Sequence, residues 1–184
     1  MHARKYLFDA GLQYSTNRSD DVRLWRGRFV EEFALAETLV SEALAFLSDF
    51  AVEGRKSLLP HLLGQRFEAL KAVVGANGDL AGLGSRVAKA LDHFKDFQAL
   101  RAFICHGHGI VTVEEDGKWV ETLHRVTFRG AAIHRESVQI TEDEAMLIVE
   151  QLRAARVRLD GQLKGMLATF SLPAVTTARV RGAR

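Results

Sequence analysis

The chain has 184 residues, of which 47% are hydrophobic and 26% are charged, and these ordinary values exclude a wholly disordered protein. The 25 basic and 23 acidic side chains leave a net charge of +2, which excludes a protein that coats nucleic acid through a broad basic surface. A single cysteine, Cys105, excludes an internal disulfide framework and favours a reducing compartment. No segment has the pattern of a signal peptide or a membrane span, so we expect a single-domain cytoplasmic protein.

The first predicted element is a long helix over Asp20–Phe50, preceded by an N-terminal segment, 1–19, without a sustained hydrophobic period. Ser19 is a candidate N-cap, and acidic residues follow it in the first turn. Apolar residues then recur at steps of three and four, which is the spacing of one helix face. This stripe consists of Trp25, Phe29, Phe33, Ala36, Val40, Ala43, Leu47 and Phe50.

Two further helices are predicted before the middle of the chain. One starts near Ser57, with Pro60 in its first turn, and ends before the glycine-rich breaker at Gly75. The next runs from about Leu83 to Cys105 or His106, where Gly107 stops it. The apolar stripe of the first is Leu59, Leu63, Phe67, Leu70 and Val74; that of the second is Leu83, Val87, Ala90, Phe94, Phe97, Arg101 and Ile104.

A β-rich insert follows, at about 110–140. Residues 110–115 alternate as a strand does, and Asp116-Gly117 is typical of a two-residue hairpin turn. The returning strand is predicted from Trp119 to Phe128, with Val120, Thr122, Val126 and Phe128 on one face. Ile133 and residues 138–140 could also form a short third strand, and the sequence does not decide this point.

The last predicted helix begins at a capping box, in which Thr141 is the N-cap and Glu144 follows three residues later. Its stripe ends near Phe170, and Pro173 terminates it. Residues 171–184 carry arginines without acids, and we expect a disordered basic tail there. The full stripe is Ala145, Ile148, Leu152, Ala155, Leu159, Leu163, Met166 and Phe170.

Together these elements predict a mainly α fold: a four-to-five-helix up-and-down bundle over residues 20–170, with a β-hairpin between the third and fourth long helices. Several of the stripes are close to heptad spacing, so we expect a homodimer paired through helices.

One residue breaks the apolar pattern of the third long helix. Arg101 lies on the stripe between Phe97 and Ile104, although arginine is seldom buried without a partner. Its stem could pack while its charge reaches solvent, or it could pair with an acid such as Glu31, Glu32 or Glu150. Alternatively, its planar fork of donors binds an anion. His106 follows five residues later and His108 seven; the carbonyl end of a helix favours a charged histidine, a residue type suited to acid–base catalysis.

The stretch from Leu100 to Gly107 resembles the R-x4-H motif of the HEPN superfamily, which usually reads Arg-Asn-x-x-x-His at the C-terminal end of a bundle helix. The resemblance implies a helical-bundle domain and a metal-independent endoribonuclease of the toxin or defence type that works as a dimer. Arg101 would then hold the scissile phosphate, and His106 would act as the general acid or base for attack by the RNA 2′-hydroxyl. His108 is a possible auxiliary group.

Ala102 departs from the family motif, because it replaces the usual polar residue after the arginine and cannot hydrogen-bond to a phosphate. An alternative interpretation is therefore a non-catalytic HEPN-like module that binds RNA, a nucleotide or a protein such as a cognate antitoxin. A second alternative is a structural bundle in which Arg101 forms a buried salt bridge.

No other constellation predicts a cofactor or a metal. His106 and His108, with His93, His124 or His134, lack the spacing of a zinc site. Cys105 is interpreted as a small core residue. Arg153, Arg156 and Arg158 form a basic cluster on the last helix and are candidates for RNA contact.

Overall fold

The computed structural model describes residues 16–49, 60, 63–130 and 132–171 of the chain. Within these ranges, no helix is long and apolar enough to cross a membrane. The chain divides into two compact units: unit 1 comprises residues up to Leu35 together with Phe94–Arg156, and unit 2 comprises Ala36–His93 together with the residues from Val157 onward. The three long helices each contribute residues to both units.

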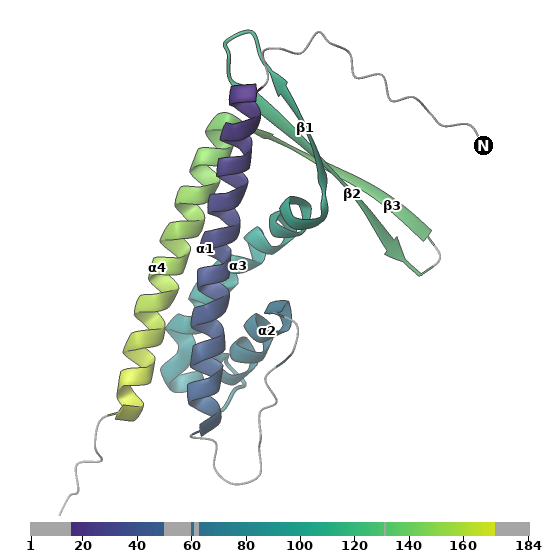
Figure 1. Cartoon of the computed structure of the whole chain (residues 1–184). Helices are drawn as coiled ribbons and strands as arrows, with labels where there is room; N and C mark the ends of the chain where they lie inside the picture. Colours follow the sequence, from purple (N-terminus) through teal and green to yellow (C-terminus); the bar gives the residue numbers. More distant parts are fainter. Residues whose placement is uncertain (1–15, 50–59, 61–62, 131, 172–184) are drawn as a thin grey trace, which may run out of the picture. The chain divides into compact units, whose positions relative to one another are not determined.

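The fold is mainly helical with a small antiparallel sheet (Figure 1). The described part contains four helices and three strands in the order α1, α2, α3, β1, β2, β3, α4. Their bounds are Thr16–Asp49 for α1, Leu63–Val74 for α2, Ala81–His106 for α3, His108–Val113 for β1, Trp119–Arg129 for β2, Ala132–Thr141 for β3 and Glu142–Ser171 for α4.

The helix boundaries confirm α3 and α4 and correct two starts. The helix α1 begins at Thr16, so Ser19 lies inside it and is not its N-cap. Arg18 is held there by ion pairs with Asp21 and Glu142. Pro60 lies outside any helix, because α2 begins at Leu63. The predicted start at Ser57, most of the segment 1–19 and the predicted tail after Ser171 lie outside the described residues.

The insert is a three-stranded sheet rather than a hairpin, with β2 in the centre and both neighbours antiparallel to it. The strand β3 runs over ten residues and pairs with β2 from Thr141 opposite Val120 to Ala132 opposite Arg129. Ile133 and residues 138–140, which suggested a short third strand, therefore belong to one strand, β3.

The turn between β1 and β2 is longer than predicted. The backbone N–H of Glu114 donates to the carbonyl of Lys118, and Gly117 has a φ of 82°. A two-residue turn of the Asp-Gly type needs two consecutive residues with positive φ, whereas only Gly117 has one within this turn. The Asp116 carboxylate instead accepts a hydrogen bond from the Lys118 N–H.

The two faces of the sheet differ. Trp119, Glu121 and Leu123 alternate along β2 and are buried, so this set faces the interior of unit 1. Of the predicted face, Val120 is buried, but Val126 and Phe128 are exposed. The far end of β2 and β3 therefore carries apolar side chains on the solvent side.

The core of unit 1 is a run of aromatic rings on α1 that contacts α3 and the sheet. Trp25 lies 5.9 Å from Trp119, and Phe33 lies 6.0 Å from Phe94, between ring centroids. The Trp25 indole donates a buried 2.8 Å hydrogen bond to the Ala145 carbonyl. This bond ties the first turn of α4 to α1, so the predicted aromatic stripe is the core.

The helices α1 and α4 run side by side in the same direction within unit 1. Arg18 pairs with Glu142 near the start of both helices, and Glu32 pairs with Arg156 further along both. This course differs from a simple up-and-down order, in which the first and fourth helices are antiparallel. The capping box of α4 is confirmed, since the Glu144 N–H donates to Thr141 Oγ1 and the Thr141 N–H donates to Glu144.

In unit 2, α2 packs closely on the start of α3. A Cβ on Gly84 would lie 2.4 Å from the Val74 Cβ, so a side chain there would separate the two helices. Gly84 therefore occupies the position that Leu83 was predicted to take, and Leu83 is exposed. The buried hydrophobic residues of this unit are Ala36, Val40, Ala43, Leu44, Phe67, Leu70, Val74, Val87, Ala90, Leu91, Leu159, Leu163 and Met166.

The heptad-like stripes thus fill the interior of the chain. Trp25, Phe29 and Phe33 on α1 and Leu152 on α4 are at most 4% exposed. These stripes are not available to a second copy, so they give no support to a homodimer paired through them.

Candidate functional site

The residues of the predicted motif lie at the C-terminal end of α3. Arg101 and Ala102 are half-buried within the helix, whereas His106 is its last residue and is exposed. The Gly107 N–H closes the helix with a 2.7 Å hydrogen bond to the Phe103 carbonyl. His108 then opens β1 and is exposed.

Arg101 lies against the aromatic core. Its guanidinium carbon is 5.1 Å from the centroid of the Phe33 ring, a cation–π distance. Phe33 is buried, so the stem and the flat face of Arg101 are packed. The acids weighed as its partners are placed differently: Glu32 accepts a hydrogen bond from Arg156, while Glu31 and Glu150 are exposed. The side chain of Arg101 is thus held at its flat face by the Phe33 ring.

The helix stays regular through the motif. Five residues on an α-helix correspond to about 140° of rotation and a rise of about 7.5 Å, so Arg101 and His106 point to different sides of α3. No turn between them brings the side chains together. A ligand that touches both must cross the end of the helix.

The α3–β1 junction, Gly107-His108-Gly109, is tightly enclosed. A Cβ on Gly107 would lie 2.4 Å from the Phe103 carbonyl oxygen and 3.1 Å from that of His124. A Cβ on Gly109 would lie 2.2 Å from Glu121 Oε1 and 2.4 Å from Arg26 Nη2. The distances of 2.2 to 2.4 Å leave no room for a side chain, so the two glycines let the junction lie close to β2 and α1.

A buried ion pair lies beneath this junction, and sequence reasoning missed it. Glu121 is 1% exposed and forms an ion pair of 2.7 Å with Arg26 Nη2, while Arg26 Nε donates to Glu121 Oε2 at 3.2 Å. Burial raises the pKa of the Glu121 carboxyl above its usual range, against the opposing effect of Arg26. The sequence did hold a sign of this burial. Side chains alternate between the two faces of a strand, so Glu121 shares one face of β2 with Trp119 and Leu123.

An apolar cleft of about 440 Å³ lies beside the motif, between α3, β3 and the start of α4. Leu100 and Phe103 form its α3 wall, and the Arg125 guanidinium lies 4.5 Å above the Phe103 ring. His106 follows Phe103 by three residues, so it lies on the same side of α3. The remaining lining residues are Asp96, Ala99, Val138, Gln139, Ile140, Glu144, Leu147 and Ile148.

The basic cluster on α4 does not act as one surface. The Arg156 Nε donates a 2.5 Å hydrogen bond to Glu32, and its side chain is 21% exposed. Arg153 lies 4.0 Å from the same carboxylate but is 71% exposed. Arg158 is exposed and belongs to unit 2. Arg156 therefore joins two helices, and Arg153 remains open to a ligand.

The structure places Cys105 on the surface, so the prediction of a small core residue is wrong. Its neighbour Ile104 takes the buried position instead. Among the described residues, no group of three or more histidines, cysteines and acids could hold a metal ion. His108 and His124 are directly opposite each other on β1 and β2, on the open face of the sheet.

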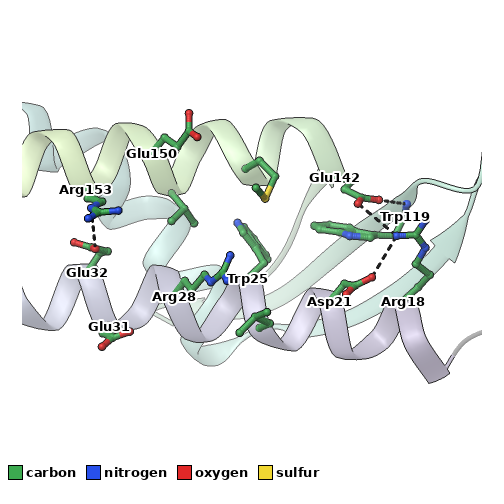
Figure 2. A pocket seen from close by; sticks show the side chains of 13 residues that line it. Arg18, Asp21, Trp25, Arg28, Glu31, Glu32, Trp119, Glu142, Glu150 and Arg153 are labelled. Carbon is green, nitrogen blue, oxygen red and sulfur yellow. Dashed lines mark hydrogen bonds and ion pairs between the residues drawn. The ribbon is translucent and has the colours of Figure 1, made fainter.

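A second hollow, the α1–α4 groove, runs along the outside of the two parallel helices (Figure 2). Its volume is about 700 Å³, and both apolar and charged residues line it. Two ion-pair groups border it: Arg18 with Asp21 and Glu142, and Glu32 with Arg153. It is lined by Arg18, Asp21, Leu24, Trp25, Arg28, Glu31, Glu32, Trp119, Glu142, Met146, Val149, Glu150 and Arg153.

Comparisons of the chain with protein-family models, with curated proteins and with solved structures return no match.

Proposed function

We propose that the chain is a HEPN-like domain that cleaves RNA without a metal at the end of α3. The observation that carries the proposal is the position of His106: it is exposed, it is the last residue of the helix, and Arg101 precedes it by five residues. The packing of the helices into one bundle of the HEPN type belongs to the same proposal.

The enclosed junction supports this function. Catalytic groups need a fixed position, and Gly107 and Gly109 fix the chain on either side of His108 by close backbone contacts. The packing of Arg101 on Phe33 restrains its guanidinium in the same way. An RNA strand that crosses the helix end could then meet a restrained cation and an exposed imidazole.

The reaction proposed is an internal transfer of the phosphoryl group. The RNA 2′-oxygen attacks the adjacent phosphorus, the new P–O2′ bond forms, and the P–O5′ bond breaks. His106 accepts the proton of the 2′-hydroxyl while water protonates the leaving 5′-oxygen, or it donates a proton to the 5′-oxygen while water accepts that of the 2′-hydroxyl. Arg101 donates hydrogen bonds to the non-bridging oxygens, where negative charge grows in the transition state. The products are a 2′,3′-cyclic phosphate and a 5′-hydroxyl end.

The test is a cleavage assay on unstructured RNA in the presence of a chelator. We expect Arg101→Ala and His106→Ala each to lower the cleavage rate at least about a hundredfold. Two matched controls on the exposed surface of α3, Arg86→Ala and His93→Ala, should keep the rate of the wild type. If all five proteins give the same trace cleavage, the ribonuclease proposal is wrong.

A second candidate function is binding without cleavage, and two observations favour it. Ala102 offers no hydrogen bond to a phosphate, and the regular helix keeps Arg101 and His106 on different sides. In this case the same residues bind RNA, a nucleotide or a protein partner such as an antitoxin. A binding measurement separates the two functions, since Arg101→Ala would then weaken RNA binding while the wild type leaves the RNA intact.

A further inference from the structure

The α1–α4 groove carries a pattern that the proposed function does not use. On α1, Leu24, Arg28 and Glu31 line the groove, and Leu35 continues the same steps of four, three and four just beyond its lining. These steps define a second stripe beside the buried aromatic one. Leu24 is 55% exposed and Leu35 is 45% exposed, so the stripe faces solvent.

The helix α4 repeats the arrangement. Met146, Glu150 and Arg153 follow at steps of four and three, and Met146 is 54% exposed. All three line the groove. Each helix therefore presents an apolar residue followed by two opposite charges, in the order basic then acidic on α1 and acidic then basic on α4.

The charges at the centre of this surface are open to a partner. Arg28, Glu31 and Glu150 are exposed, and within the described ranges none of them forms an ion pair or a hydrogen bond of its side chain. Arg153 is 71% exposed and reaches Glu32 only at 4.0 Å. Figure 2 shows Arg28 between the two helices, beside Trp25.

We propose that the α1–α4 groove is an interface with a second copy of this chain. The stripe on α1 is complementary to itself when two copies run antiparallel: Arg28 meets Glu31 of the second copy, Glu31 meets its Arg28, and each Leu24 meets a Leu35. On α4, Glu150 likewise meets Arg153 of the second copy. This isologous arrangement satisfies both signs of charge with one surface.

One two-fold axis serves both helices. Since Glu32 is paired with Arg153 and Arg156, the levels of α1 and α4 along the groove are known. The midpoint of Arg28 and Glu31 therefore lies at about the level of the midpoint of Glu150 and Arg153. A foreign partner would need a matching charge order on two helices, whereas a second copy has it by symmetry.

The experiment is sedimentation velocity of the whole chain with charge-reversal variants. We expect the wild type to dimerise, and Arg28→Glu or Glu31→Arg alone to weaken the dimer at least about tenfold, because each creates two like-charge contacts. The double variant Arg28→Glu/Glu31→Arg restores the order of opposite charges, so its dissociation constant should return to within about threefold of the wild type. Arg23→Glu, exposed on α1 but outside the stripe, is the control and should change nothing.

Three results would overturn the proposal. The first is a wild type that is monomeric at about 100 µM, where a micromolar interface would be nearly saturated. The second is a dimer that both single variants leave intact, since that dimer uses another surface. The third is a double variant as weak as the single ones. Folding of each variant is checked by circular dichroism, which a change at an exposed position should not alter.

Discussion

The α3–β1 junction and the α1–α4 groove lie in the same unit but use charge in opposite ways. At the junction, Glu121 and Arg26 form an ion pair, and the backbone of Gly109 is packed against it. In the groove, Arg28 and Glu31 are exposed, and neither side chain pairs with another residue in the described part of the chain. An ion pair inside the unit fixes the backbone around it. Exposed charges of opposite sign at a regular spacing, such as Arg28 and Glu31, are instead suited to binding a second molecule.

The largest effect should come from breaking the junction pair. Glu121→Ala leaves Arg26 without its carboxylate, and we expect a loss of about 2–3 kcal/mol in the free energy of unfolding, since the side chain of Arg26 is 26% exposed and can partly reach water. The control Asp20→Ala breaks an exposed pair with Arg23 and should cost less than about 0.5 kcal/mol. Equal losses in urea denaturation of the two variants would contradict the assigned difference.

A methyl group at Gly109 tests how tightly the junction is enclosed. Gly109→Ala would bring its Cβ within 2.4 Å of both Glu121 and Arg26, so we expect a loss of about 1–2 kcal/mol. The matched variant is Gly161→Ala, because a Cβ there meets nothing within 4 Å. It should stabilise α4 by about 0.5–1 kcal/mol. Thermal unfolding followed by circular dichroism gives both values, and a neutral Gly109→Ala would show a loose junction.

The start of α4, at one end of the groove, should respond more moderately. Thr141→Ala removes the N-cap of α4 and should cost about 1 kcal/mol. Hydrogen bonds from Thr141 lower the pKa of Glu144 below its ordinary value of 4.5. The stabilisation by ionised Glu144 is therefore present above that value and is lost as the pH falls through the lowered pKa. In unfolding measured as a function of pH, Thr141→Ala should flatten this acid limb only in part, because the backbone N–H of residue 141 still donates to Glu144. An unchanged limb would show that the Thr141 hydroxyl does not couple to Glu144.

The smallest effect on stability is expected in the groove. Leu24→Ser changes a side chain that is 55% exposed, so the loss in the free energy of unfolding should be under about 0.5 kcal/mol. The same variant should weaken self-association in sedimentation, because Leu24 lies in the proposed interface. If stability falls strongly while association is unchanged, Leu24 supports the fold and the contrast between the two regions fails.

Local patterns in the sequence were sufficient for much of the helical structure. The steps of three and four predicted most of the buried residues of α1 and α4, and Thr141 with Glu144 predicted the capping box, because both depend on neighbours along one helix. The end of α3 at His106 was likewise predicted from Gly107. These features need no knowledge of distant residues.

The rest depends on contacts between elements. The apolar stripe on α3 predicted a buried Leu83, but α2 approaches α3 closely at Gly84, and Gly84 faces α2 instead. The pairing of Glu121 with Arg26 joins residues far apart in the sequence, and only the parity of β2 hinted at the burial of Glu121. At the candidate site, the sequence located Arg101 and His106, whereas the packing of Arg101 on Phe33 required the fold.

The proposed function requires that the end of α3 cleave RNA through the 2′-hydroxyl. The most direct measurement is mass spectrometry of the products from an RNA oligonucleotide and from the same oligonucleotide with 2′-deoxy sugars throughout. We expect the RNA to give fragments that end in a 2′,3′-cyclic phosphate. The deoxy oligonucleotide should give no fragments, and the His106→Ala variant should give none from the RNA. Cleavage of both oligonucleotides, or fragments that His106→Ala produces equally well, would contradict it.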